Sequence, residues 1–305
     1  MLNNMLKNIE QKIKQKSIDF FPYTNVIGLS RSLLAFGTLI TLLFNNESVL
    51  IHKTSGGVYL NPFINSNSYF FDFNFFALFG IENFIFSKII AILILCLVIS
   101  GYFIKITSIL HWWISISFFM ISSVIDGGDQ ITSILTLLLL PLCLTDKRKN
   151  HWCKIIPFYS PYSLMGVFSV YIIRLQMAVV YFHAAVGKFN VEEWANGTAL
   201  YYWLNHSFFG SPDFIIPSIN FILSNKWINP ILTYSVLIFE LLLFLAFTAS
   251  IKYRKRILTF GIIFHLSIVF LHGIFSFFFA MVAGLIIYLY PSNESINLKF
   301  FKNEQ

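Results

Sequence analysis

The side chains best suited to take part in chemistry lie in one apolar stretch, residues 166–203. It holds an arginine, a glutamine, a histidine and a lysine, namely Arg174, Gln176, His183 and Lys188. An ionised Arg or Lys at the centre of a membrane-spanning helix costs about 2.5 to 3.5 kcal/mol. A stretch that keeps several such groups is therefore a candidate functional site, suited to proton transfer or to binding a polar group.

Helical spacing divides these side chains between two faces. Arg174, Tyr181 and Lys188 recur every seven residues and form one stripe. Gln176 and His183 lie on another face, about 200° away. Arg174 is either a site residue or a buried strut held by an acid or a carbonyl. His183 is either a site residue or hydrogen-bonded to a neighbouring helix.

Lys188 is the strongest candidate for a catalytic base. Near the outer end of its helix, this lysine can extend its amine to water. Alternatively, an apolar environment disfavours the ammonium form and leaves a neutral amine that accepts a proton. The adjacent Gly187 and Phe189 do not decide between the two surroundings.

Ionisable residues in later apolar runs are candidate partners. Glu240 is the one acid in its run, so we expect it to pair with Arg174, Arg31 or a histidine from another helix. His265 and His272 are seven residues apart and share a helix face, which is typical of a relay. A glycine follows His272, so the alternative is that this histidine caps a turn.

Asp126 and Asp129 bracket two glycines in the sequence DGGD. Their carboxylates are candidate cation ligands. The alternative is a turn in which the glycines adopt positive φ angles and an aspartate caps the next helix. Across the sequence no two histidines are spaced i, i+4, and no C-x-x-C occurs. We therefore predict no metal site and no thiol–disulfide chemistry.

The rest of the chain must position these groups in a bilayer. Of 305 residues, 57% are hydrophobic and 11% are charged, whereas soluble chains carry about 25% charged residues. The mean hydropathy is +0.72. The net charge of +7 is distributed in short clusters between apolar runs, a pattern that excludes a nucleic-acid-binding face. We predict an all-α, polytopic transmembrane helical bundle.

Eight apolar runs predict about eight spans. They cover residues 26–44, 86–104, 106–125, 131–144, 164–186, 228–249, 257–271 and 274–290. With both termini in the cytoplasm, fifteen Lys and Arg residues fall in cytoplasmic segments and three in outer ones. This positive-inside signal predicts a multi-pass cell-membrane protein with Lys188 near the extracytoplasmic face.

The predicted organisation has three parts. Residues 1–25 form a basic, amphipathic cytoplasmic N-terminus without the features of a cleavable signal peptide. Residues 26–290 form the transmembrane domain, and residues 291–305 form a cytoplasmic tail. Two extracytoplasmic loops interrupt the domain at about 45–85 and 187–226. The first is rich in Phe, so we expect it to lie along the membrane interface.

Short motifs of this chain resemble those of the HTTM domain, the horizontally transferred transmembrane domain shared with vitamin K-dependent gamma-carboxylases. The matching residues are Arg174, Gln176, Tyr181, Gly187, Lys188, Trp194 and Gly197, with the DGGDQ loop, Phe264, His265 and Met281. The phrase IDGGDQITSILTLLLLPLCLTD, residues 125–146, is similar to the sporulation-delaying protein B family, which matures a secreted peptide toxin. The resemblance extends from residue 31 to residue 281.

By this resemblance, Lys188 matches a lysine that acts as the base on a reduced quinone in the carboxylases. It implies that a membrane quinone is the cofactor, whereas the residues by themselves name none. The side chains around the lysine would be Arg174, Tyr181, Trp194 and His265. The other candidate pocket residues are Arg31, Gln176, His183, Gly197, Glu240, His272, Asp126 and Asp129.

Two function classes follow. The first is a membrane maturation factor for a secreted toxin or antimicrobial peptide, acting at the extracytoplasmic face. We expect no counterpart of the large extracytoplasmic domain of the carboxylases, so substrate capture would fall to the loops or to a small companion protein. Such a factor could be an enzyme, either a carboxylase-like lyase or another peptide-modifying enzyme. The second class is a non-catalytic exporter, channel or immunity module.

Overall fold

The computed structural model describes residues 2–51, 53–54, 57–58, 73–123, 126–207 and 209–296. Within these ranges the regular secondary structure is helical apart from the two-residue strands β1 (Lys53–Thr54) and β2 (Gly57–Val58), which pair antiparallel. The all-α prediction is confirmed.

Each of the eight apolar runs coincides with a helix. These helices are α2 (Asn25–Phe44), α4 (Phe84–Ser100), α5 (Ile104–Ile121), α6 (Gly127–Thr145), α7 (Ser163–Lys188), α11 (Ile228–Leu245), α12 (Ile251–His272) and α13 (Phe275–Leu289). Six are long and apolar enough to cross a membrane, if the 3-10 turn η3 (Ala246–Thr248) is counted with α11. Six candidate spans are typical of a multi-pass membrane protein. The helices α4 and α13 are shorter, so the count of eight spans stays a prediction.

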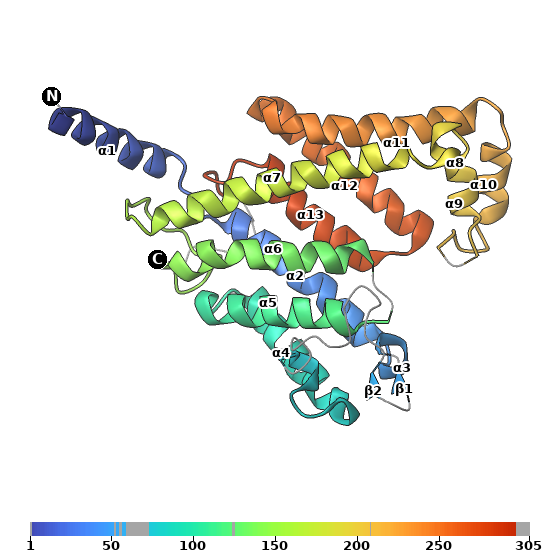
Figure 1. Ribbon diagram of the computed structural model, residues 1–305, viewed down its shortest axis with the longest axis horizontal. Coiled ribbons are helices and arrows are strands. Elements are labelled where there is room, and N and C mark those ends of the chain that lie inside the picture. The colour runs from blue at the N-terminus through green and yellow to red at the C-terminus, as the bar shows by residue number, and fades with distance from the viewer. Residues whose placement is uncertain are drawn as a thin grey trace.

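Several of the remaining helices lie at the two ends of the bundle (Figure 1). Helix α1 (Leu2–Asp19) projects from one end, which we call the α1 end. The short helices α8 (Glu192–Ala195), α9 (Ala199–Leu204) and α10 (Ile216–Leu223) cover part of the other, which we call the cap end. Three more short helices are α3 (Glu47–Leu50), η1 (Phe75–Ala77) and η2 (Ile81–Asn83).

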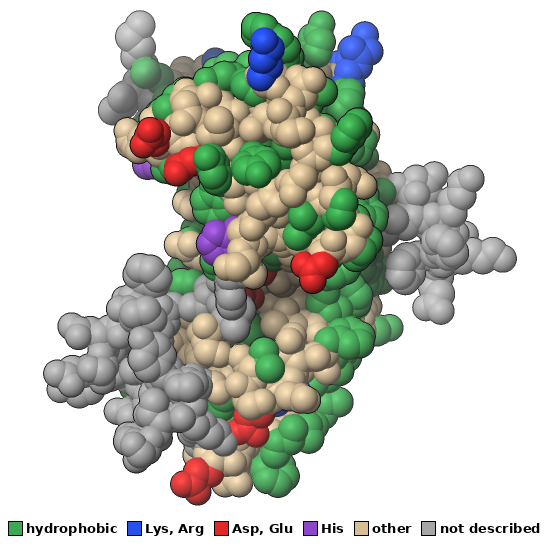
Figure 2. Space-filling view, turned by 90° about the vertical axis from the view of Figure 1, so that its right-hand side faces the viewer, with side chains coloured by type: hydrophobic (Ala, Val, Ile, Leu, Met, Phe, Trp, Pro, Cys, Tyr) green, Lys and Arg blue, Asp and Glu red, His purple; other side chains and the backbone are tan. Residues whose placement is uncertain are grey.

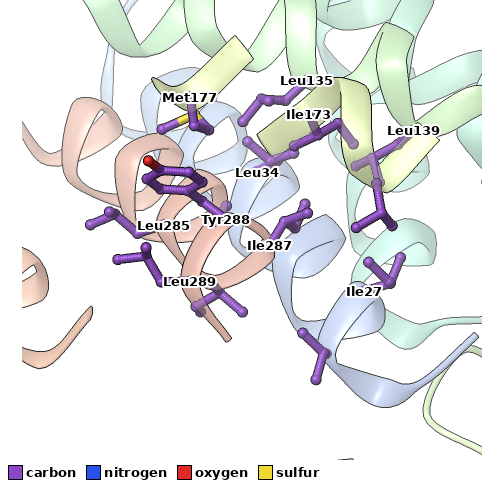
Figure 3. Close-up of a cluster of buried hydrophobic side chains, with 14 of the residues drawn as sticks. Ile27, Leu34, Leu135, Leu139, Ile173, Met177, Leu285, Ile287, Tyr288 and Leu289 are labelled. Carbon is purple, nitrogen blue, oxygen red and sulfur yellow. The ribbon is translucent and has the colours of Figure 1, made fainter. Parts of the chain in front are cut away.

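Helix α13 forms the centre of the bundle. It packs against α2, α6, α7 and α12, and every residue from Ala280 to Leu289 is buried. A helix that is apolar on all sides suits such a position. Figure 3 shows Tyr288 and Leu285 of α13 beside Met177 of α7. Because lipid is as apolar as these side chains, close packing rather than escape from water stabilises this core within the bilayer.

Two phenylalanines of the predicted interfacial loop lie in a second core instead. Phe75 and Phe76 are 2% and 0% exposed, and the ring of Phe76 stacks on Phe84 with centroids 5.3 Å apart. Their backbone is compatible with burial because the Phe75 amide donates to the Ser117 hydroxyl (2.9 Å). These two rings pack inside the protein rather than facing outward, the interfacial position of the loop stays a prediction, and residues 59–72 of the same loop lie outside the described part of the chain.

The DGGD sequence begins helix α6 rather than forming a separate loop. Asp126 is the N-cap residue: its Oδ1 accepts from the Asp129 amide (3.0 Å), and Ser276 donates to its other oxygen. The predicted cap is confirmed, but the predicted positive φ angles are wrong, because both glycines are helical. Gly128 is needed for a close approach, since a Cβ there would lie 2.6 Å from Phe277 Cα.

We therefore expect Gly128→Ala to destabilise the contact between α6 and α13. The added methyl meets backbone that cannot rotate away, and overpacking of this kind costs about 1 to 3 kcal/mol. The apparent melting temperature of the detergent-solubilised protein measures the loss. Gly127→Ala is the matched control, because its Cβ would meet a phenylalanine ring edge at 3.3 Å. Equal melting temperatures for the two variants would contradict the close approach.

Candidate functional site

A cavity of about 830 Å³ lies at the cap end, between the C-terminal part of α7, the helices α8 to α10, and the facing parts of α11 and α12. Most of its wall is apolar or aromatic, with Trp194 and Trp203 on the cap side. Its polar lining residues are His183, Lys188, Ser235, Glu240, Ser267 and His272. The cavity is therefore suited to a largely apolar ligand with a small polar group.

Lys188 and Glu240 form an ion pair in the wall of this cavity. The Lys188 Nζ lies 2.7 Å from both Glu240 carboxylate oxygens and 3.1 Å from the Ala184 carbonyl oxygen. The Trp194 ring centroid is 5.2 Å from the same nitrogen. The Lys188 side chain is 23% exposed and that of Glu240 is 9% exposed. The ammonium group thus has a partner for each of its three protons and still borders the cavity.

The predicted partners of Glu240 are wrong, because Lys188 takes that place. Helix α11 packs along α7, which brings the carboxylate to the last turn of α7. Neither predicted surrounding of Lys188 is observed: the amine is neither extended freely into water nor enclosed by apolar side chains alone. Transfer of one proton from Lys188 to Glu240 would convert the ion pair into a neutral amine and a carboxylic acid.

A second polar pair lies behind the cavity wall. The Tyr181 hydroxyl is 2.9 Å from His265 Nε2, and each residue is 2% exposed. The rings of Phe264 and Phe277, which line the cavity, contact the His265 ring. Among the described residues no hydrogen-bond partner is present for His265 Nδ1. His265 and Tyr181 therefore support the wall rather than line it.

Arg174 lies far from this cavity. It precedes Lys188 by fourteen residues, which is about 21 Å along a helix. Its guanidinium donates to the carbonyl oxygens of Ile287 and Tyr290 at 3.2 Å each, and lies 5.2 Å from the Phe20 ring centroid. Of its two predicted roles, these contacts are those of a strut held by carbonyls.

Arg31 is also far from the cavity, in a buried network towards the α1 end. Its Nη1 donates to His151 Nδ1 (3.0 Å) and its Nη2 to the Thr107 hydroxyl (3.1 Å). His151 follows α6 in a turn, outside the membrane-spanning helices. Burial, with Arg31 and Arg148 nearby, lowers the pKa of His151 from 6.5 to about 2. His151 therefore remains neutral, as an acceptor from Arg31 must be.

The remaining candidates differ in whether they line the Lys188 cavity. His183 is exposed and lines the cavity, whereas Gln176 does not line it. His272 lies at the cavity edge, where α12 ends in a left-handed Gly273, and its Nδ1 is 2.7 Å from the Phe209 carbonyl oxygen. This is the predicted turn at the end of a helix. Gly197 has φ +80° and packs on α11.

Asp126 and Asp129 line a second cavity of about 760 Å³, not that of Lys188. The two cavities adjoin, since both include Phe209, His272 and Ile274 in their walls. Within the described ranges no group of three or more His, Cys, Asp or Glu residues could hold a metal ion.

Sequence reasoning missed two polar residues of the Lys188 cavity. Ser235 of α11 and Ser267 of α12 line it beside Glu240. A hydroxyl inside an apolar run is a weak signal, because serine can bond to its own helix backbone. Both do so here: Ser235 donates to Leu232 O and Ser267 to Phe264 O. Their position at the cavity follows from the tertiary arrangement.

The sequence is similar to two proteins of Bacillus subtilis (strain 168). It is 34% identical to sporulation-delaying protein SdpB over 281 residues, which are 92% of this chain and 85% of that protein. It is also 34% identical to the uncharacterized protein YitO over 304 residues, which are 98% of this chain and 95% of that protein. No family model matches the chain, and no solved structure matches it. The HTTM resemblance therefore stays a prediction.

We expect the removal of either residue of the Lys188–Glu240 pair alone to destabilise the protein. Lys188→Met or Glu240→Leu leaves a partly buried charge without its partner, at a cost of about 1 to 3 kcal/mol. The double variant removes both charges and should recover much of that loss. Melting curves of the four proteins give the coupling. Additive losses in the double variant would contradict a direct interaction.

His151 should make the protein less stable in acid. Because its folded pKa of about 2 lies below the ordinary 6.5, the unfolded chain takes up a proton first as the pH falls below 6.5. At one pH unit below 6.5, this proton uptake lowers the free energy of unfolding by about 1.4 kcal/mol. His151→Asn should therefore weaken the fall in melting temperature between pH 7.5 and about 5.5. The exposed His183, changed to Asn, is the control and should leave that fall intact.

Proposed function

Since this chain belongs to the sporulation-delaying protein B family, we propose that it is a membrane maturation factor for a secreted toxin or antimicrobial peptide. It acts at the extracytoplasmic face, together with a small companion protein that helps to present the precursor. The working site is the cavity at the cap end. This proposal depends most on one observation, the Lys188–Glu240 pair in the wall of an otherwise mainly apolar cavity.

The placement of the pair favours function over support. A charge that serves as a strut is enclosed, as Arg174 is by two carbonyl oxygens and an aromatic ring. Lys188 instead borders the cavity, where a ligand can reach its amine. Ionisable groups within membrane-spanning helices are costly, and those that face a cavity commonly bind or transfer protons.

Lys188 would act as the general base. When its proton passes to Glu240, the neutral amine can accept a proton from a polar group of the bound substrate. Glu240 holds the amine in position before and after the transfer. Trp194 covers one side of the amine and limits access of water. The Tyr181–His265 pair fixes the wall behind α7.

The cavity residues fit the membrane quinone that the HTTM resemblance implies. Trp194 and Trp203 offer flat apolar surfaces, and the Lys188–Glu240 pair offers one polar group at the wall. These four side chains would hold the ring and its oxygen. When bound in its reduced form, such a group supplies electrons for modifying the peptide.

Charge asymmetry supports an extracytoplasmic position for the cap end. The face seen in Figure 2 carries acidic groups and few basic ones among its hydrophobic and uncharged side chains. The basic clusters 147–154 and 252–256 flank helix ends on the α1 side. By the positive-inside rule, the α1 end lies in the cytoplasm.

A channel or exporter has less support. Such a path needs polar groups between the two ends of the bundle. The buried charges Arg31 and Arg174 are instead held by His151 and by carbonyl oxygens away from the cavity. An immunity or export role is instead an outcome of the experiment below.

The test is the mass of the secreted peptide from cells that make the wild-type protein, Lys188→Ala or no protein. We expect Lys188→Ala to lower the amount of modified product by about 100-fold or more, since a general base contributes at least that much. Lys226→Ala is the matched control, because Lys226 is an outer lysine stacked on Trp227 and does not line the cavity.

The level of each variant in the membrane is measured in the same cells. If the peptide has one mass in every strain and differs only in amount, the chain is an export, assembly or immunity factor. That result would remove the catalytic role of Lys188.

A further inference from the structure

Helix α1 is attached to the bundle near its C-terminal end. The Ser17 hydroxyl is 3.3 Å from that of Ser163, the Asn293 amide donates to the Asp19 carbonyl oxygen (3.2 Å), and Lys14 lies 5.4 Å from the Tyr159 ring centroid. The first turns of the helix extend beyond the bundle (Figure 1). Their side chains are therefore accessible to another surface.

The projecting turns carry an apolar stripe. Met5, Leu6, Ile9 and Ile13 are 60%, 54%, 42% and 42% exposed. Their spacing of three, four and seven residues gathers them on about 100° of the helix circumference. Gln11 lies on the opposite face, about 200° from Ile9. A stripe of this kind on a short polar helix is typical of a helix that lies in a membrane interface.

The charges around the stripe select the kind of surface. Helix α1 has four lysines, at positions 7, 12, 14 and 16, against two acids, Glu10 and Asp19. At the same end of the bundle, further basic side chains are exposed, namely Lys147, Lys149, Lys154, Lys252 and Arg256. Basic groups that come from several segments at one end of the bundle match a surface of negative charge, as anionic headgroups provide.

A short connection allows the helix to reach that plane. Residues 20–24 between α1 and α2 are not helical and include Pro22, which cannot continue a helix hydrogen-bond ladder. The angle between the two helices is therefore set by the contacts at the base of α1 and by the buried Phe21 and Tyr23, rather than by continuous helix.

We infer that α1 is an interfacial helix that lies on anionic phospholipid headgroups beside the α1 end of the bundle. The apolar stripe enters the boundary between headgroups and acyl chains. The lysines extend to the phosphates. This helix anchors the end of the bundle opposite to the Lys188 cavity, and the inference does not depend on the proposed function.

Site-specific fluorescence on the full chain tests this inference. The two exposed cysteines are replaced (Cys96→Ser and Cys153→Ser) and the buried Cys143 is kept. A polarity-sensitive dye is then attached at Ile9→Cys or, as the matched control, at Gln11→Cys. The protein is reconstituted in vesicles of phosphatidylcholine alone or mixed with phosphatidylglycerol, with brominated acyl chains as the quencher.

In anionic vesicles we expect the lipid quencher to act on the dye at position 9 at least about twofold more than at position 11. Replacing Lys7 and Lys12 by Gln should reduce that difference, as should vesicles of phosphatidylcholine alone. Equal quenching at both positions in anionic vesicles, with full access of aqueous iodide, would overturn the inference. A difference unaffected by lipid charge or by the lysines would overturn the selection of anionic headgroups.

Discussion

The Lys188–Glu240 ion pair is the interaction on which the cavity at the cap end depends for its polar character. It joins the end of α7 to α11 and forms the polar part of a cavity that is otherwise mainly apolar. An unpaired charge at this position would be costly, so each residue requires the other. The same requirement explains Arg174 and Arg31, which are held by carbonyl oxygens and by His151. Only the Lys188 pair borders a cavity among these three charged sites.

The helices could be predicted from the sequence because an apolar run of this length has few alternatives to a helix in a bilayer. All eight runs coincide with helices, and Asp126 caps α6 as its position before the helix predicted. The loop residues Phe75 and Phe76 were not predicted to be buried. Their burial depends on Asn74 and Ser117, which satisfy the local backbone across about forty residues of sequence.

The candidate site could be predicted in part from the sequence. Helical spacing placed Arg174 and Lys188 on one stripe, yet a stripe seven residues in period runs the length of α7, and its two ends serve different purposes. The partner of Glu240 could not be predicted, because the sequence offers several basic residues that could pair with it. The packing of α11 against α7 selects Lys188. The asymmetry of the molecule then becomes clear: basic anchoring groups gather at the α1 end, and the cavity lies at the cap end.

The most direct test of the central claim exchanges the two charges. The variant Lys188→Glu with Glu240→Lys keeps an ion pair in the same place but moves the amine to α11. If Lys188 acts as a base in a defined position, this variant should insert and melt like the wild type while its cells secrete unmodified peptide. If those cells secrete the mature peptide in normal amounts, the pair is a structural contact and the claim is wrong.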